Sequence, residues 1–465
     1  MRRTALASVF LFASALLAQA PSPSPKDPPD LGPLLDEFCK PLIDGGVVKG
    51  LVVGVIDGDR TLTRGYGRAR ADADGAPDAL TIFEIGSVSK VFTGVLLGAA
   101  VARGEVALDD LAQKWMPEGR TLPKTDANEI RLVHLSTHTS GLPRLPSNMD
   151  PEAEDPYATL TRDAVYEGAC TATLRNEPGT TYEYSNLGAG LLGQLLVDRA
   201  GAASYEALLK ERVIGPLSLE RTTIDQLELL PAMMASAYDV DLEPVKPWNL
   251  AALAGAGGIR STVADMLSFA RAQWETPKDE LLSKAFALAR TKQKDIPGGA
   301  AIGLGWHLAK DGITWWHNGE TGGFHSALFV RPSERRAVVV LCNTATGLVD
   351  AVAEGITQRL CGMATEPPRV ETAVAVAEDV LQRYVGVYEL RPGIALAVTL
   401  RSGKLAAQIT GQPALRLHAR SATEFFYRAV QATIRFQVEG ETCSGLELEQ
   451  AGRRMKWTRT AQQIR

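Results

Sequence analysis

The sequence predicts an α+β fold: one antiparallel sheet flanked by N- and C-terminal helices, an inserted helical subdomain, and then a small all-β barrel-like domain. Strand patterns occur at residues 50–66 and return at 303–343, so both stretches are expected to share one sheet. Between residues 108 and 234 the apolar spacing is helical. From residue 384 to 458, about eight short alternating runs follow one another, which is typical of a barrel or sandwich.

Residues 1–20 have the parts of a secretory signal peptide. Two arginines precede an apolar run at residues 5–17, and Ala18-Gln19-Ala20 follows it. Pro21 is expected to hinder cleavage directly after Ala20, so cleavage after Ala18 and retention of the segment stay open alternatives. Because the apolar run is too short to cross a bilayer, we expect an exported chain, periplasmic or secreted, with no transmembrane span in its mature form.

Composition and charge argue against other classes of protein. The chain has 465 residues, of which 45% are hydrophobic and 22% charged, as in ordinary globular proteins. Its formal net charge is −5 and no basic block could follow a phosphate backbone, so no nucleic-acid partner is expected. The five cysteines are widely spaced, and the one bridge that we hypothesise joins Cys39 to Cys361. The oligomeric state is left open.

The domain boundaries follow from composition. Residues 21–33 are rich in proline and are expected to form a disordered leader, and the main domain is placed at 34–362. A proline-containing linker at 363–378 precedes the barrel-like domain at 379–465. Within the main domain we expect helices at 34–42, from about Ser87 to Gly104, up to Gly141, at 187–197, after Thr262 and at 345–360, and strands at 50–57, 61–66, 303–308, 313–317, 327–330 and 337–343.

Two histidines raise the question of a metal site. His134 and His138 are four residues apart and could share one face of the helix that is expected to end at Gly141. No third ligand or glutamate stands at a suitable spacing, so a structural role near the site is the preferred interpretation.

Three short motifs carry the candidate chemistry. Ser87-Val88-Ser89-Lys90 opens a helix, where a lysine three positions after a serine lies on the same face and can reach its hydroxyl. Tyr184-Ser185-Asn186 lies on a turn-rich loop before a helix, and His317-Asn318-Gly319 is expected at the end of a strand beside glycines. Each motif alone is typical of a cap, a packed loop or a turn, but together they indicate an acyl-transfer site.

These motifs resemble those of the class C β-lactamase and DD-peptidase superfamily. Residues 83–90 match the active-site pattern of class C enzymes, and residues 184–186 match their second motif. The resemblance covers about residues 34–362, while the C-terminal part looks like the lipocalin-like domain appended to some members. It implies a β-lactamase/transpeptidase-like fold and a serine hydrolase that needs neither metal nor organic cofactor.

The resemblance also implies roles for single residues. Ser87 would be the nucleophile, and Lys90 or Tyr184 would take its proton, with Tyr184 also activating the hydrolytic water. Asn186 would hydrogen-bond the substrate amide, and His317, Asn318 and Gly319 would also contact the substrate. The backbone N–H groups of Ser87 and Glu320 would form the oxyanion hole.

The third motif departs from the family pattern. His317, followed by Asn318 and Gly319, stands where class C enzymes have a lysine that binds the substrate carboxylate. A histidine with an ordinary pKa of ~6.5 is mostly neutral at pH 7, so this carboxylate clamp is expected to be weaker.

The substrate is expected to be a small molecule or a peptidoglycan-type peptide. Hydrolysis of β-lactam amides is the first reading, and a DD-carboxypeptidase, D-aminopeptidase or esterase with the same machinery is the alternative. A non-catalytic exported binding protein is a further alternative. The loops at 142–157 and 243–253 are expected to decide the substrate.

Overall fold

The computed structural model describes residues 29–150, 155–224, 232–275 and 277–461. The predicted signal peptide and most of the predicted leader lie outside these residues. The described chain forms two compact units, a larger one that holds residues 48–368 with the N-terminal helix, and a smaller one that holds residues 369–461. Within the described residues, no helix is long and apolar enough to cross a membrane.

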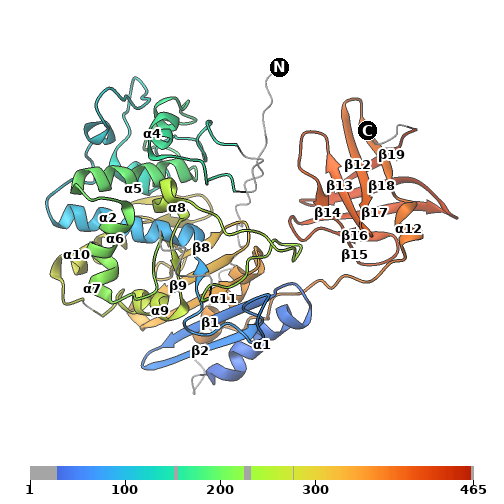
Figure 1. The fold of residues 1–465 in the computed structure, drawn as a ribbon, viewed down its shortest axis with the longest axis horizontal. Coiled ribbons are helices and arrows are strands. Elements are labelled where there is room, and N and C mark those ends of the chain that lie inside the picture. The colour runs from blue at the N-terminus through green and yellow to red at the C-terminus, as the bar shows by residue number, and fades with distance from the viewer. Residues whose placement is uncertain (1–28, 151–154, 225–231, 276, 462–465) are drawn as a thin grey trace. The chain divides into compact units, whose positions relative to one another are not determined.

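An eight-stranded antiparallel sheet forms the centre of the larger unit (Figure 1). Its strand order is β2-β1-β10-β9-β8-β7-β6-β5. The N-terminal hairpin thus joins the late strands through β1 and β10, where Leu51 pairs with Cys342. This confirms the predicted fold class. The strands are β1 Gly50–Asp57, β2 Arg60–Gly67, β5 Lys294–Ile296, β6 Ala300–Ile302, β7 His307–Leu308, β8 Trp315–Glu320, β9 His325–Arg331 and β10 Arg336–Cys342.

Helices cover both faces of this sheet, and all eight residues of β1 are therefore buried. On one face, Gly54 lets α9 approach so closely that an added Cβ would lie 2.7 Å from Val263 and 2.8 Å from Leu267. On the other face lie α1 and α11, and Gly355 of α11 packs against the Phe38 ring of α1. These helices are α1 Leu31–Asp44, α9 Val263–Arg271 and α11 Leu348–Leu360.

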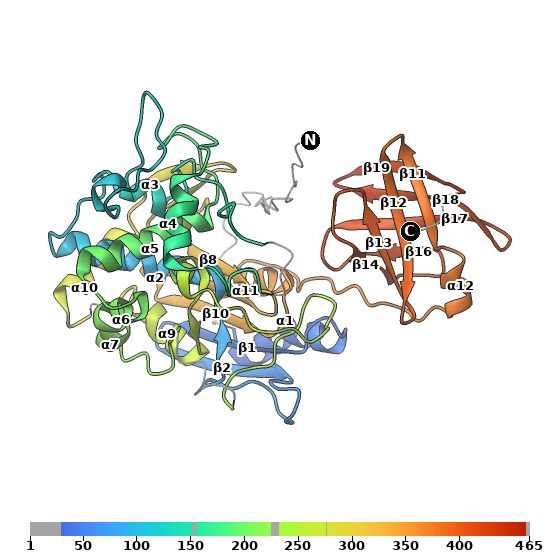
Figure 2. The ribbon, with the colours of Figure 1, turned by 45° about the horizontal axis from the view of Figure 1, so that its top comes forward.

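The inserted region is helical, as predicted, and α2 and α5 lie side by side within it (Figure 2). A short two-stranded sheet, β3 Phe83–Glu84 with β4 Arg260–Ser261, joins its two ends. The helices between these strands are α2 Ser89–Ala102, α3 Leu132–Ser136, α4 Arg162–Cys170, α5 Asn186–Ala200, α6 Tyr205–Leu209, α7 Gly215–Leu217 and α8 Ala254–Gly257. Helix α10, Glu280–Ala289, follows β4 and packs against α2.

Several predicted boundaries are wrong for local reasons. The helix predicted to end at Gly141 ends at Ser136, because His138 adopts a left-handed conformation with φ 57°. The strand predicted at 303–308 is mostly a turn between β6 and β7. Strand β8 extends to Glu320, so the third motif lies within the strand rather than at its end. The hypothesised bridge between Cys39 and Cys361 is also wrong, since both thiols are free and Cys361 Sγ lies 3.7 Å from Glu334 Oε2.

The smaller unit is a nine-stranded antiparallel sheet in the order β14-β13-β12-β11-β19-β18-β17-β16-β15. Its two edge strands are neighbours in the chain, separated only by Leu417, so the sheet curls into a nearly closed barrel-like form, as predicted. Tyr384, Phe425 and Phe436 pack inside it, with Tyr384 stacked on Phe436 at 4.1 Å between ring centroids. The elements are α12 Glu378–Gln382, β11 Gly386–Arg391, β12 Ile394–Arg401, β13 Lys404–Ile409, β14 Leu415–Arg416, β15 His418–Ala419, β16 Glu424–Phe426, β17 Ala432–Glu439, β18 Thr442–Gln450 and β19 Arg453–Arg459.

Candidate active site

Ser87 and Lys90 meet at the start of α2. Ser87 lies in a single 3₁₀ turn, Gly86–Val88, that leads into the helix, and its side chain is partly exposed. Lys90 is only 2% exposed, and its Nζ lies 2.9 Å from Ser87 Oγ. The predicted three-residue spacing therefore places an amine directly against the hydroxyl.

The segment before Ser87 is held by buried polar contacts. Ile85 N donates to Ile259 O at 3.0 Å, and Ser326 Oγ donates to Ile85 O at 2.8 Å. Glu84 forms a fully buried ion pair with Arg260, with Nη2 and Oε1 3.0 Å apart. These contacts fix the serine to both the short sheet and β9, so its position does not depend on α2 alone.

The buried amine of Lys90 is held in a form suited to accept a proton. Besides Ser87 Oγ, its Nζ lies 2.5 Å from Ala256 O, so the amine is fixed between two oxygens. Burial, and then the nearby charge of Arg144, hold the pKa of Lys90 well below its ordinary value. A neutral amine next to a serine hydroxyl can act as a general base.

Tyr184 completes the group that the first two motifs predict. Its ring lies 4.7 Å from Lys90 Nζ, and its phenol faces Ser87. Although Tyr184 keeps part of its surface open, burial raises the pKa of its phenol to about 12, and a hydrogen bond to Ser87 opposes this only in part. The phenol therefore stays protonated at neutral pH, which makes it a proton donor rather than a base in the free enzyme.

Asn186 lies at the first position of α5. Ser185 caps the helix, since its Oγ accepts from Gly188 N at 2.9 Å. Asn186 is partly exposed, and its Oδ1 has no hydrogen-bond partner among the described residues. The Asn186 side chain hydrogen-bonds the Tyr157 phenol, so its buried Oδ1 is the atom left without a partner.

His138 contacts the second motif, and it is not paired with His134 as two metal ligands on one helix face would be. Its left-handed backbone, a conformation in which histidine is enriched, directs the ring beneath the loop. Its Nδ1 accepts from Ser185 N at 3.2 Å, and its ring lies 4.3 Å from the Tyr184 ring. His134 instead accepts from Arg131 N, so the two histidines do not share a face. Among the described residues, no cluster of three His, Cys, Asp or Glu could hold a metal ion.

His317 lies on the buried face of β8. It is 1% exposed, its Nδ1 lies 2.5 Å from Asn318 O, and its ring lies 6.4 Å from that of Tyr184. Burial, and then the charges of His307 and Lys90, hold the pKa of His317 well below its ordinary value. The side chain is thus neutral and covered, so it does not offer a cation to a substrate.

Gly319 follows on the same face of β8 and lets two backbones approach closely. A Cβ added to Gly319 would lie 2.7 Å from Ser87 N, and one added to Gly86 would lie 2.7 Å from Glu320 N. The N–H groups of Ser87 and Glu320 therefore belong to adjoining backbone segments, as the predicted oxyanion hole requires.

The side chains of Asn318 and Glu320 lie on the other face of the strand, in a charged network. Asn318 Nδ2 donates to Asp350 Oδ2 at 2.8 Å, and His325 lies between Asp350 Oδ1 at 2.9 Å and Glu320 Oε2 at 3.1 Å. Burial acts to lower the pKa of His325, but Asp350 and Glu320 outweigh it and raise the pKa to about 10. The network holds the end of β8 against α11, and substrate binding by Asn318 stays a prediction.

Arg144 is the residue near the site that the sequence did not single out. It is exposed, and its Cζ lies 5.2 Å from the centroid of the Tyr184 ring. It lies in the loop 142–157 that was expected to choose the substrate. Arg144 and Tyr184 are about 40 residues apart in the sequence, so no local sequence pattern could have revealed this cation–π contact.

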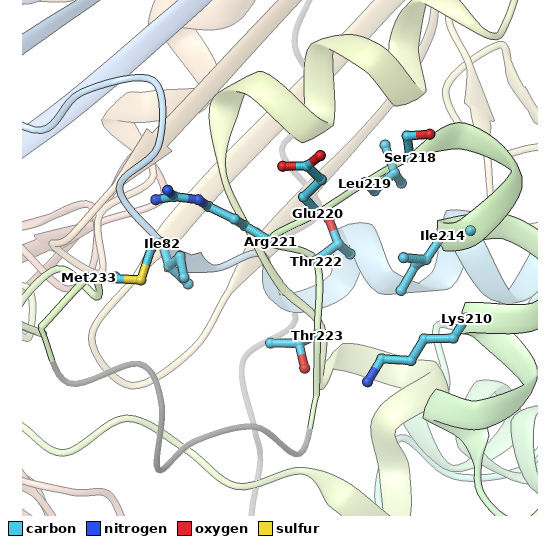
Figure 3. Close-up of a pocket in the computed structure, with 11 residues that line it drawn as sticks. Ile82, Lys210, Ile214, Ser218, Leu219, Glu220, Arg221, Thr222, Thr223 and Met233 are labelled. Atoms are coloured by element: carbon cyan, nitrogen blue, oxygen red, sulfur yellow. The ribbon is translucent and has the colours of Figure 1, made fainter.

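Two hollows lie elsewhere in the larger unit. One, of about 540 Å³, is lined by residues that include Lys210, Glu220, Arg221 and Thr223 (Figure 3). The other, of about 310 Å³, lies between α4, α5 and α6. Neither is lined by the three predicted catalytic residues, so neither hollow is the serine site at the start of α2.

Comparison with known proteins gives concordant matches. Residues 35–360 match the family model described as Beta-lactamase. A β-lactamase of Escherichia coli K12 is 30% identical over 380 residues, covering 74% of this chain and 95% of the relative. The D-alanyl-D-alanine-carboxypeptidase/endopeptidase AmpH of the same organism is 27% identical over 392 residues, covering 80% of this chain and 99% of the relative.

A solved structure shows the same fold. The β-lactamase/D-alanine carboxypeptidase from Yersinia pestis, crystallised with citrate, superimposes with a TM-score of 0.63 at 24% identity. The match covers 71% of this chain and 97% of the Yersinia chain.

Proposed function

We propose that this chain, which belongs to the beta-lactamase family of serine hydrolases, is an exported enzyme that hydrolyses β-lactam amides through an acyl-enzyme on Ser87. One observation carries the proposal. The Lys90 amine lies 2.9 Å from Ser87 Oγ, and burial favours its neutral form. A hydroxyl next to an uncharged amine is an activated nucleophile.

The proton path follows from the two pKa directions. Lys90 would take the proton of Ser87 as Oγ attacks the carbonyl carbon of the amide. The phenol of Tyr184 would give its proton to the leaving nitrogen as the C–N bond breaks, and protonated Lys90 would restore it. Because the pKa of Tyr184 is raised, we assign the role of base to Lys90.

The backbone and the second motif would complete the reaction. The N–H groups of Ser87 and Glu320 would stabilise the oxyanion, and Asn186 would hydrogen-bond the acyl amide. In deacylation Lys90, neutral again, would take a proton from water and then return it to Ser87 as the ester is cleaved. This assigns to Lys90 the water activation that the resemblance implied for Tyr184.

A D-alanyl-D-alanine carboxypeptidase is the second candidate. The observation that favours it is the similarity to AmpH, which extends over 99% of that relative. Both reactions would use the same three side chains, so they differ in substrate rather than in chemistry. A buried, neutral His317 stands in place of the family lysine that binds the substrate carboxylate. Both candidate reactions lose this contact, because both substrates carry a carboxylate.

Steady-state assays with nitrocefin, a D-alanyl-D-alanine peptide and a short nitrophenyl ester rank the candidates. We expect nitrocefin to be turned over with the highest kcat/KM. Fast ester turnover with a negligible nitrocefin rate would reject β-lactam hydrolysis as the main activity.

Intact-mass analysis separates an enzyme from a binding protein. Incubation with penicillin or a fluorophosphonate should add one covalent group to the wild type and none to Ser87→Ala, because the nucleophile is lost. Wild-type protein without an adduct would favour the non-catalytic alternative. The barrel interior weakens that alternative, since aromatic side chains fill the core in which a ligand would lie.

We also propose the predicted domain division, with the hydrolase at 34–362 and the barrel-like domain at 379–465. Export rests on the signal-like residues 1–20. Mass analysis of the mature chain from periplasm and medium would test export and locate the cleavage point.

A further inference from the structure

A substrate carboxylate beside Ser87 needs a cation, and β8 does not supply one. His317 is covered and neutral. On the other face of the strand, Glu320 and Asp350 are acidic, with the single imidazolium of His325 between them. The third motif therefore brings no surplus positive charge to the site.

Arg144 is a cation close to the reacting groups. Its guanidinium lies 5.2 Å from the Tyr184 ring, which in turn lies 4.7 Å from Lys90 Nζ. Its positive charge acts to lower the pKa of Lys90, of Tyr184 and of Glu320. Among the residues that the structure describes, its guanidinium has no hydrogen-bond or ion-pair partner, and the residue is exposed. The five N–H donors of the guanidinium are thus open to a ligand.

The backbone fixes where Arg144 stands. Arg144 O accepts from Asn186 N at 2.9 Å and from Leu187 N at 3.1 Å, and Pro143 O accepts from Ser185 Oγ at 2.7 Å. The arginine is therefore tied to the first turn of α5, beside the tyrosine and asparagine of the second motif. A long side chain on a fixed backbone can bind a ligand with little loss of freedom in the loop.

We propose that Arg144 is a specificity-determining residue that pairs with a carboxylate of the substrate, in the role that the third-motif lysine has in class C enzymes. This inference rests on the proposed function. The guanidinium fork matches a carboxylate in a bidentate pair. The carboxylate could belong to a penicillin or to the C-terminus of a D-alanyl-D-alanine peptide.

Paired substrates isolate this role. Penicillin G is compared with its methyl ester, and diacetyl-L-Lys-D-Ala-D-Ala with its C-terminal carboxamide, for wild type, Arg144→Ala, Arg144→Lys and Arg369→Ala. Loss of the Arg144 charge also raises the pKa of Lys90, but this change affects both members of a pair equally. The ratio of kcat/KM for acid over neutral substrate therefore reports the carboxylate contact alone.

We expect Arg144→Ala to lower this ratio about tenfold or more, mainly through KM, since a charged pair is worth about 1.4 kcal/mol or more. Arg144→Lys should keep part of the ratio, because a point charge remains. Arg369→Ala, which removes an exposed arginine from the smaller unit, should leave the ratio unchanged. The penicillin pair and the peptide pair show which source of carboxylate is preferred.

Two results would overturn the inference: a ratio in Arg144→Ala within about twofold of wild type, or a wild type without preference for the acid forms. In either case an active wild type leaves the proposed function standing. If no substrate acylates the wild type, the proposed function fails and the inference fails with it.

Discussion

The two units of this chain bury different kinds of side chain. Around Ser87 the larger unit buries Lys90, Glu84, Arg260 and several histidines, each of which would be better solvated in water. In the described part of the smaller unit, His418 is the only residue outside the apolar, aromatic and cysteine classes that is buried. The larger unit thus spends stability on placing polar groups, whereas the smaller one is built on aromatic packing. Activity and stability are expected to respond to mutation separately in the two units.

The largest expected effect separates activity from stability within the larger unit. Lys90→Met keeps the side-chain length but removes the base, so acylation of Ser87 should fall by about 10²–10⁴-fold. The free energy of unfolding should change by only about 1 kcal/mol, because loss of the contact with Ala256 O is offset by removal of a buried amine. Burst kinetics with nitrocefin and denaturant unfolding measure the two quantities. An acylation rate within tenfold of wild type would show that Lys90 is not the base.

The next effect is the converse, in the smaller unit. Phe436 stacks on Tyr384 and meets Phe425 edge-on at 5.5 Å, so Phe436→Ala should destabilise this unit by about 3–5 kcal/mol. Acylation of Ser87 should stay unchanged. Hydrogen exchange read by peptide mass locates the loss of protection.

Phe269→Ala is the matched control for this prediction. Phe269 also stacks at 4.1 Å, on Phe92 of the helix that carries Lys90, so its loss should reduce both protection and acylation. If Phe436→Ala slowed acylation as much as Phe269→Ala does, the separation between the units would be disproved.

The smallest effect concerns pH. His325→Gln removes an imidazolium between Asp350 and Glu320 and should cost about 1–3 kcal/mol of stability at pH 7. Because its folded pKa of about 10 lies above the unfolded value, His325 contributes fully below pH ~6.5, and the contribution is lost as the pH rises through 10. The gap in unfolding free energy between wild type and variant should therefore narrow between pH 7 and pH 10. A constant gap would mean that His325 is neutral when folded.

The sequence predicted most of what local chemistry determines. The contact of Lys90 with Ser87 depends on one helical turn, and the inserted helical region was indicated by strand patterns that stop and return. The barrel was predicted from alternation alone. Each of these signals lies within a few neighbouring residues.

Contacts made across the fold were not predictable in the same way. His317 was expected at a strand end, but pairing with β9 carries the strand on to Glu320, so its neutral state follows from burial. His138 leaves the helix early, with its ring held by Ser185 N, 47 residues further along the chain. Arg144 is held near the site because its backbone oxygen bonds the first turn of α5. The hypothesised bridge between Cys39 and Cys361 was wrong because the distance between two helices far apart in the chain has no local signal in the sequence.

Because the first hairpin pairs with one of the last strands of the larger unit, this sheet cannot be completed until most of the chain has been synthesised. Lys49 N bonds Thr344 Oγ1 across 295 residues, at the same edge where β1 meets β10. At the ~5–20 residues per second of protein synthesis, β1 waits roughly 15–60 s for its partner strand. Closing so long a loop is also intrinsically slow. During this interval the side of β1 that later pairs with β10 is unpaired, so a newly made chain exposes a strand edge that the finished protein covers.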